Sequence, residues 1–288
     1  MQQEAPPTAP LYVVATPIGN LADMSPRALQ TLRDVALIAA EDTRHTGRLL
    51  SHFGLSTPLM ALHDHNEERV VDRVLRQLRS GAAVALVSDA GTPLISDPGY
   101  RLVRAAVAAG VAVETVPGPS AVMAALSVCG LPVDQFVFAG FLPPRDEARQ
   151  RFIRTLADET RTVVVFESVH RIESTLAALA DLLPPARELS IHRELTKQYE
   201  SAYRGTAGEL LGAFRAGELI AKGEFVIVIA GADAPLAATS APVDIDALLR
   251  VLLASMPLKQ AVAATVKLTG HGRNQLYQQA LAISRESP

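Results

Sequence analysis

The chain has 288 residues, of which 49% are hydrophobic, and it carries a formal net charge of −3 at pH 7. A chain of this length and composition buries a sizeable core as one large domain or two smaller ones, which excludes a disordered or fibrous protein. The slight negative charge excludes a generally basic nucleic-acid-binding protein, so any nucleic acid would have to be met by a local basic patch.

Targeting and metal signals are lacking in the sequence. We find no charged-then-apolar leader and no apolar run long enough to span a bilayer, so we expect a cytoplasmic protein without a membrane partner. The single cysteine, Cys129, lies in an apolar segment and is expected to be buried and unreactive. No cysteine and histidine cluster has metal-ligand spacing, so we expect no metal site.

Short apolar runs alternate with helical patterns in the first part of the chain. Their unbroken apolar character is typical of strands covered on both faces of a parallel sheet. The runs are residues 11–15, 35–40, 58–63, 83–88 and 111–116. Between them, Ser25 before Pro26 and Asp97 before Pro98 each suit an N-cap and a first helical position. The sequence therefore predicts an N-terminal α/β domain over residues 11–118.

The pattern changes after a proline-containing stretch near residue 143. Strands are expected at residues 162–168, 188–195 and 224–231, with a polar hairpin-like segment at 196–206. Consecutive strands with few intervening helices predict a second, mixed-sheet α+β domain over residues 119–231.

The last part of the chain has a different composition. Residues 232–243 read as a flexible linker, and residues 244–285 as a small domain of two or three short helices. Gly270 is expected to break the last pair of helices, and Asn274 to cap the final one. A helix-turn-helix element and a helical cap packed on the main body are both compatible with this pattern.

Polar residues follow each strand of the predicted parallel sheet. Parallel strands bring their carboxyl ends to one edge, where ligands of open α/β sheets bind. The strand-end segments are TPIGN (16–20), EDTRHTGR (41–48), HDHNEE (63–68), SDAGTPLISDPG (88–99) and PGPS (117–120). We therefore expect a ligand site at this edge.

The segment at 88–99 is the most unusual of the five. Gly91 and Gly99 let the backbone approach a ligand closely, and the two prolines lower the entropy lost on ordering. Asp89 and Asp97 can accept hydrogen bonds from amino or hydroxyl groups, which predicts a preformed cradle. The alternative for Asp97 is that it merely caps the next helix.

Other nucleotide and hydrolase signatures are missing. TPIGN lacks the spaced glycines of a dinucleotide-binding turn, and the chain has no P-loop and no serine elbow. Two charged clusters, FESVHR (166–171) and RELTKQYE (193–200), follow strands of the second domain and would face a cleft between the domains. Arginines at 145–154 form either a phosphate-binding patch or a solvated helix face paired with Asp146 and Glu147.

Together these motifs resemble the ribosomal RNA small subunit methyltransferase I family, which has the tetrapyrrole methylase fold. The resemblance runs in order from about residue 11 to 231 and continues through the C-terminal helices. Its motifs are TPIGNLADMSPRAL, EDTRHTGRLLSHFG, HDHNE, SDAGTPLISDPG, PGPSA, FLPPR, FESVHR and RELTKQYE. The resemblance implies a two-domain α/β fold, a parallel sheet followed by a mixed sheet, with a small C-terminal helical element.

The resemblance also implies an activity. The family transfers a methyl group from S-adenosylmethionine to the ribose 2′-oxygen of a cytidine in 16S rRNA, at the decoding centre of the 30S subunit, and the wider fold is homodimeric. Its cofactor lies between the two domains. The residues that would face the cofactor are Pro17, Gly19, Asp89, Ala90, Gly91, Ser120, Ala121, Phe166, Glu167, Leu195 and Gly223.

Two further groups of residues are expected to act on the RNA. We hypothesise that the EDTRH cluster, Glu41, Asp42, Arg44 and His45, positions the ribose, because its charges lie at the sheet edge and a weak hydroxyl nucleophile benefits from a nearby base. The expected RNA contacts are Arg145, Arg149, Arg151, Arg171, Lys259, Lys267 and Arg273.

Two other functions remain open from the sequence. A methyltransferase for a small tetrapyrrole would share the fold but would need neither arginine-rich segments nor C-terminal helices. A ribosome-assembly factor could keep the pocket and bind RNA without turnover. Methyl transfer to different acceptors distinguishes the three functions.

Overall fold

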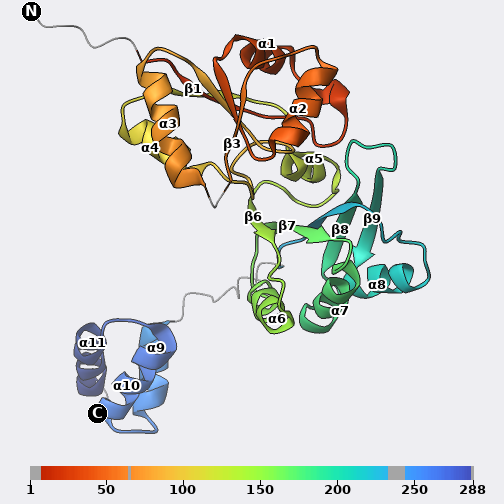
Figure 1. Ribbon diagram of the computed structural model, residues 1–288. Helices are drawn as coiled ribbons and strands as arrows, with labels where there is room; N and C mark the ends of the chain where they lie inside the picture. The colour runs from red at the N-terminus through yellow and green to blue at the C-terminus, as the bar shows by residue number, and fades with distance from the viewer. Residues whose placement is uncertain (1–7, 64–65, 233–243, 287–288) are drawn as a thin grey trace, which may run out of the picture. The chain divides into compact units, whose positions relative to one another are not determined.

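The computed structural model describes residues 8–63, 66–232 and 244–286 (Figure 1). The chain divides into two compact units, Met1–Ala232 and Asp233–Pro288. The segment 233–243, most of the predicted linker, lies outside the described residues. Each unit is considered by itself.

The first unit begins with a five-stranded sheet in the order β3-β2-β4-β1-β5, and every pairing in it is parallel. The strands are β1 (Leu11–Val14), β2 (Leu37–Ala40), β3 (Leu59–Ala61), β4 (Val84–Val87) and β5 (Val113–Val116). The predicted parallel sheet is thus confirmed, with each strand one to three residues shorter than its apolar run.

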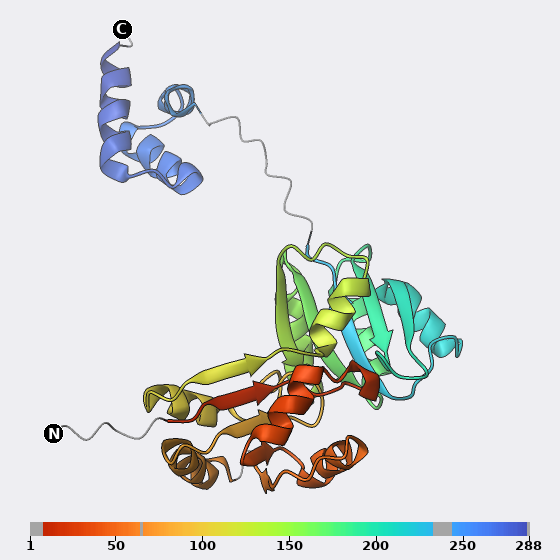
Figure 2. The same ribbon diagram turned by 90° about the horizontal axis from the view of Figure 1, so that it is seen from above.

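Two helices cover each face of this sheet. The short 3-10 helix η1 (Leu21–Asp23) precedes α1 (Pro26–Asp34), which packs with α2 (Thr43–His52) on one face through Leu32 and Leu50. On the other face, α3 (Glu67–Arg79) and α4 (Tyr100–Ala108) pack through Val74 and Leu102 (Figure 2). The loops that follow the carboxyl ends of the five strands gather at one edge of this sheet.

The two predicted helix starts have different outcomes. Ser25 caps α1, with its Oγ accepting a hydrogen bond from the Ala28 N–H at 3.1 Å. The prediction that Asp97 caps α4 is wrong, because the N-cap is Gly99. Glu67 supplies the acceptor instead, since its Oε1 takes the Arg101 N–H at 2.8 Å. Asp97 is therefore left available for the cradle.

The second sheet has the order β6-β7-β10-β8-β9 and is mixed, as predicted. Only the β6 and β7 pair is parallel. The strands are β6 (Phe136–Phe141), β7 (Thr162–Ser168), β8 (Glu188–Arg193), β9 (Ser201–Thr206) and β10 (Glu224–Ile229). The sequence did not predict β6, an edge strand whose register shifts between Phe138 and Phe141.

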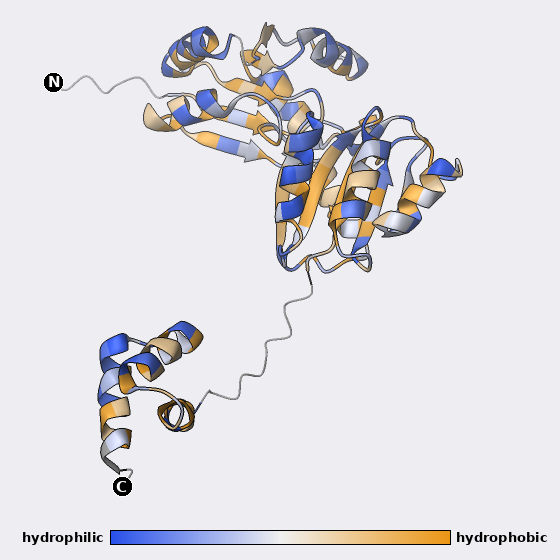
Figure 3. Cartoon of the chain, turned by 90° about the horizontal axis from the view of Figure 1, so that it is seen from below, coloured by the Kyte–Doolittle hydropathy of each residue, from blue (hydrophilic) through white to orange (hydrophobic). Residues whose placement is uncertain are grey.

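Helices cover both faces of the second sheet. Between its strands lie α6 (Asp146–Thr155), α7 (Ile172–Leu182) and α8 (Ala207–Arg215), so the expectation of few intervening helices is wrong. These three pack on one face around Phe225. On the other face, α5 (Ala121–Val128) forms a cluster with Val164 and Val226, which also includes Ile18 from the first sheet's edge and the buried Cys129. The hydropathy colouring of Figure 3 shows apolar residues concentrated on the strands of both sheets.

The second unit contains three helices among its described residues: α9 (Ile245–Leu253), α10 (Leu258–Thr269) and α11 (Arg273–Glu286). They enclose a small core centred on Leu249, Val262 and Leu276. Gly270 ends α10 as predicted, whereas Asn274 lies inside the first turn of α11 and is not its cap. Across the described residues, no helix has the length and apolar character needed to cross a membrane.

Candidate active site

Hydrogen bonds join four of the five strand-end segments at one edge of the parallel sheet. Thr16 and Gly91 exchange backbone hydrogen bonds of 2.9 and 3.1 Å. The Asp42 N–H donates to Asp89 Oδ1 at 3.0 Å, and the Thr92 hydroxyl donates to the Pro119 carbonyl at 3.1 Å. The fifth segment is linked to them through α4, the helix that follows the segment 88–99, since its Glu67 accepts the Arg101 N–H at 2.8 Å. The predicted gathering of these segments is therefore confirmed, and its centre is the segment 88–99.

The backbone of the segment 88–99 has a constrained shape. Leu94 and Ser96 have positive φ angles of 73°, a region that side chains other than glycine rarely adopt, and Gly91 has a φ of 81°. A Cβ at Gly91 would lie 3.2 Å from Ile18 Cγ2. Such strain is held by surrounding structure and is typical of ligand-binding loops. The segment therefore has a constrained shape, and we call it the cradle; that it holds a ligand stays a prediction.

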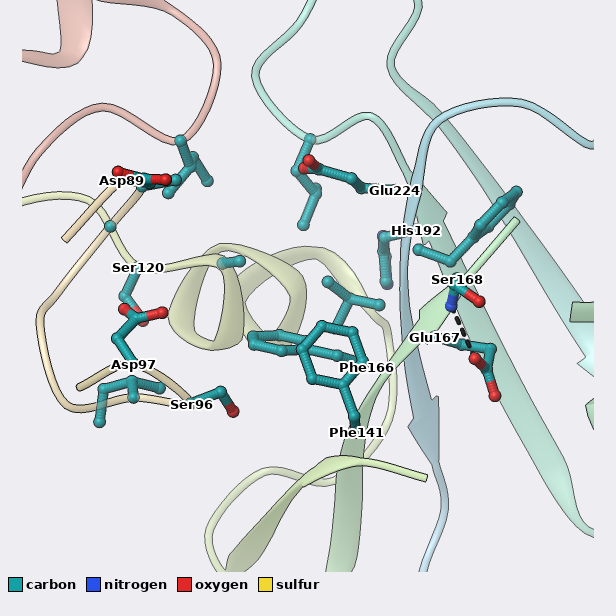
Figure 4. A pocket seen from close by; sticks show the side chains of 18 of the residues that line it. Asp89, Ser96, Asp97, Ser120, Phe141, Phe166, Glu167, Ser168, His192 and Glu224 are labelled. Atoms are coloured by element: carbon teal, nitrogen blue, oxygen red, sulfur yellow. Dashed lines mark hydrogen bonds between the residues drawn. The ribbon is translucent and has the colours of Figure 1, made fainter. Parts of the chain in front are cut away.

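A cavity of about 410 Å³ opens above this cradle, and we call it the first cavity (Figure 4). One side is formed by the loops of the parallel sheet, with Asp89, Asp97 and Ser120. The other side comes from the second sheet and includes Phe166 and His192. A volume of this size encloses a nucleoside-sized ligand.

Three carboxylates of the first sheet, Glu41, Asp89 and Asp97, line the first cavity. Burial, reinforced by the negative charges of Glu41 and Asp89, raises the pKa of Asp97 from 3.8 to about 6. The cavity therefore concentrates negative charge, which favours a ligand that carries positive charge. Perturbed carboxyl groups in a cleft are typical of functional sites.

His192 on β8 also lines the first cavity. Its ring is almost fully buried and its Nε2 lies 2.9 Å from Ser190 Oγ. Burial, together with the positive charge of Arg204, lowers the pKa of His192 to about 4, so the ring is neutral at physiological pH. A neutral imidazole adds a polar contact without opposing a positive ligand.

A second cavity of about 310 Å³ adjoins the first. Ile18, Asp89, Ala90 and Glu224 line both, so the two cavities share one wall. The remaining lining of the second cavity includes His45, Arg48, His52 and Lys197, which makes its polar surface more basic than that of the first.

The comparisons with known proteins agree with this geometry. The family model described as Tetrapyrrole (Corrin/Porphyrin) Methylases matches residues 10–211, and the model described as RsmI C-terminal HTH domain matches residues 239–284. Proteins called ribosomal RNA small subunit methyltransferase I are 47% identical in Pseudomonas aeruginosa (94% of this chain, 96% of the relative) and 50% identical in Xylella fastidiosa (93% and 97%). The chain belongs to the ribosomal RNA small subunit methyltransferase I family.

Solved structures agree on the fold. A uroporphyrin-III-C-methyltransferase from Thermus thermophilus is 22% identical with a TM-score of 0.52, covering 77% of this chain and 94% of its own. The methyltransferase CobJ is 18% identical with a TM-score of 0.58, and the match covers 78% of this chain and 95% of CobJ. The predicted tetrapyrrole methylase fold is confirmed, and the C-terminal family model favours the helix-turn-helix reading of the second unit over a simple helical cap.

The cofactor-facing residues predicted from the family resemblance surround the two cavities. Those that line the first cavity are Asp89, Ala90, Gly91, Ser120, Ala121, Phe166, Glu167, Leu195 and Gly223. Pro17 and Gly19 line the second cavity instead. A Cβ at Gly19 would lie 2.3 Å from Lys197 Cγ, so a glycine here lets the Lys197 side chain cross the TPIGN loop.

Glu167 has a second role besides lining the cavity. Its carboxylate is buried and accepts hydrogen bonds from the Ser168 N–H at 2.6 Å, which is drawn dashed in Figure 4, and from the Thr175 hydroxyl at 2.7 Å. It also forms an ion pair of 2.8 Å with Arg171. Glu167 therefore anchors the turn between β7 and α7.

The residues of the EDTRH cluster lie in three different places: the first cavity, the second cavity and the N-terminus of α2. Glu41 lines the first cavity and His45 the second. Asp42 caps α2 and pairs with Arg44 at 2.9 Å, and neither residue lines either cavity. The hydrogen bond from Arg44 holds the pKa of Asp42 well below its usual range. Glu41 and His45 thus each line a cavity, whereas Asp42 caps α2.

Two of the expected RNA contacts are occupied within the protein. Arg149 has only 4% of its side chain exposed and pairs with Asp146 and Ser174. Arg171 is bound to Glu167 and to the Leu142 carbonyl. For these two arginines the structure does not favour RNA contact, because Arg149 is buried and Arg171 is held by its partners within the protein. The other expected contacts, Arg145, Arg151, Lys259, Lys267 and Arg273, are exposed.

Sequence reasoning missed several residues of the cavities. Phe141 lies at the end of β6, the strand that was not predicted, and its ring centroid is 5.4 Å from that of Phe166. His192 reads in sequence as part of an ordinary buried strand. Arg48 and His52 were recognisable only as a basic face of α2, since they stand three and seven residues after His45.

Proposed function

We propose that this chain transfers a methyl group from S-adenosylmethionine to the ribose 2′-oxygen of a cytidine in 16S rRNA, at the decoding centre of the small ribosomal subunit. The observation that carries the proposal is the pair of adjoining cavities with the shared wall at Asp89 and Ala90. The polar side chains of the first cavity are mainly acidic, and those of the second include more basic groups, as expected for a cationic cofactor beside an anionic acceptor. The names of the relatives support rRNA as the acceptor.

The residues of the first cavity fit S-adenosylmethionine. Phe141 and Phe166 offer aromatic surface to an adenine ring, and Gly91 leaves room for close backbone approach. Glu41, Asp89 and Asp97 offset the positive sulfonium and ammonium groups. When bound, the cofactor supplies a methyl carbon whose bond to sulfur breaks, with its electron pair going to sulfur, as the bond to oxygen forms.

The protein's part in the reaction is to position the acceptor and take its proton. In-line alignment of the acceptor hydroxyl with the methyl group supplies much of the rate enhancement in such displacements. A ribose hydroxyl is a weak nucleophile, so a base assists as it loses its proton. Of the predicted cluster, we retain Glu41 and His45 as candidates for this base.

The raised pKa of Asp97 predicts a pH dependence of cofactor binding. Between pH 5 and 7 the carboxyl group loses its proton and begins to attract the cationic cofactor, so we expect affinity for S-adenosylmethionine to rise about tenfold. Calorimetric titration at several pH values measures this change. In Asp97→Asn the rise should largely disappear, and an equally steep rise in that variant would contradict the assignment.

The alternatives are a tetrapyrrole methyltransferase and a binding protein without turnover. The C-terminal helical unit favours RNA, since a methyltransferase for a small tetrapyrrole would not need it, and the names of the relatives also support rRNA. From the family resemblance we also propose a homodimer and a cytoplasmic location, both of which stay predictions.

Methyl transfer to three acceptors tests the proposal. Labelled S-adenosylmethionine is offered with 30S subunits, with naked 16S rRNA and with a uroporphyrin precursor, the RNA coming from cells that lack this modification. We expect label in the RNA only. Label in the tetrapyrrole alone would establish the first alternative, and cofactor binding without transfer to any acceptor would establish the second.

A further inference from the structure

The second cavity carries a group of basic side chains that the cofactor site does not use. His45, Arg48 and His52 stand three and then four residues apart on α2, so they share one face of the helix, and all three line the cavity. All three are exposed at the surface of the first unit.

Arg48 and His45 are available for a ligand. Within the part of the chain that the structure describes, neither side chain has a hydrogen-bond or ion-pair partner. Lys197, on the opposite side of the cavity, differs, because its Nζ is bound to Glu194 at 2.9 Å and to Glu224 at 3.0 Å. The positive charge of the second cavity that is not already neutralised therefore comes from α2.

The position of this face limits the ligand that it can hold. A molecule in the second cavity contacts the shared wall at Asp89 and Ala90, so its other end lies beside the first cavity. A guanidinium flanked by imidazoles is suited to a phosphate group, which it can bind through two parallel hydrogen bonds. In an RNA chain, a phosphodiester lies directly next to each ribose 2′-hydroxyl.

We propose that the second cavity binds the acceptor nucleotide, and that Arg48, which stands between His45 and His52 on α2, holds the phosphodiester adjacent to the methylated ribose. This inference rests on the proposed function and deepens it, since it names the residues of α2 that position the acceptor. Arg48 is a positioning residue here, and it acts by fixing the ribose against the shared wall.

The test compares Arg48→Glu and Arg48→Ala with the control Arg76→Glu, which places the same charge change on the exposed end of α3. Unmodified 30S subunits and S-adenosylmethionine are the two ligands. For Arg48→Glu we expect KM for 30S subunits to rise at least about tenfold, with cofactor affinity within about twofold of the unmodified protein. Arg76→Glu should leave both quantities unchanged.

Salt dependence separates a phosphate contact from a structural effect. Loss of one phosphate contact should lower the slope of log affinity for RNA against log salt by about 0.7 to 0.9 in Arg48→Ala. An unchanged slope and KM in both Arg48 variants would overturn the inference while leaving the proposed function intact. Weakened cofactor binding with normal RNA binding would also overturn it, because Arg48 would then hold the cofactor's carboxylate.

The failure of the proposed function has a different signature. In that case the unmodified protein transfers no methyl group to 30S subunits at any salt concentration, before any variant is compared. The assignment of Arg48 to the acceptor phosphodiester would then also be wrong, because it rests on the proposed function.

Discussion

Replacing Gly91 with valine should weaken S-adenosylmethionine binding about 100-fold, or about 2.7 kcal/mol. Gly91 has a φ of 81°, which a β-branched residue adopts only with strain, and its Cβ would press on Ile18 at 3.2 Å. The backbone of the cradle must therefore shift. Because this backbone lines the first cavity, the shift changes the shape of the proposed cofactor site. Calorimetric titration with S-adenosylmethionine measures the loss.

Gly110→Val is the matched control for this prediction. Gly110 also has a positive φ, of 70°, but no atom lies within 4 Å of a Cβ built there. It follows α4, away from the lining of both cavities. The control should lower the free energy of unfolding and leave cofactor affinity unchanged. Equal loss of affinity in both variants would show that general destabilisation, not the cradle, causes the effect.

Glu167→Ala should lower the free energy of unfolding by about 3 kcal/mol. The substitution removes three interactions of a fully buried carboxylate and leaves Arg171, only 22% exposed, without its ion-pair partner. Urea denaturation followed by circular dichroism measures the change. The effect is on stability because the carboxylate oxygens bind protein groups.

Glu173→Ala tests whether the loss belongs to the buried pair. Glu173 lies in the first turn of α7 and pairs with Arg215 at 3.5 Å, but both side chains are more than half exposed. Exposed pairs contribute little, so the change should stay within about 0.5 kcal/mol. If both variants lost the same stability, the anchoring role of Glu167 would be wrong.

The parallel sheet and its ligand edge could be predicted because the evidence is local. Each strand is a short apolar run and each is followed by polar residues, so alternation alone places the TPIGN and 88–99 segments together. The Asp97 cap was mispredicted for a tertiary reason: Glu67, 32 residues ahead of Gly99, supplies the acceptor for the start of α4. A long-range contact of this kind leaves no local signal.

Other parts of the site depend on which element lies beside which. β6 reads FVFAGF, an apolar run that contains Gly140, and only its parallel pairing with β7 shows that it is an irregular edge strand with exposed phenylalanines at both ends. The arginine stretch showed a basic helix but could not show that Arg149 turns inward to Ser174. The EDTRH cluster likewise divides because successive helical residues point in different directions, which sends His45 to the second cavity and leaves Arg44 in solvent.

Identification of the methylated atom tests the proposed 2′-O-methylation. Unmodified 30S subunits are incubated with the protein and labelled S-adenosylmethionine, and the 16S rRNA is then treated with alkali and digested to nucleosides. We expect one labelled cytidine, with the label on its 2′-oxygen and the bond on its 3′ side resistant to alkali. Label on a base, with normal alkaline cleavage at that nucleotide, would contradict it.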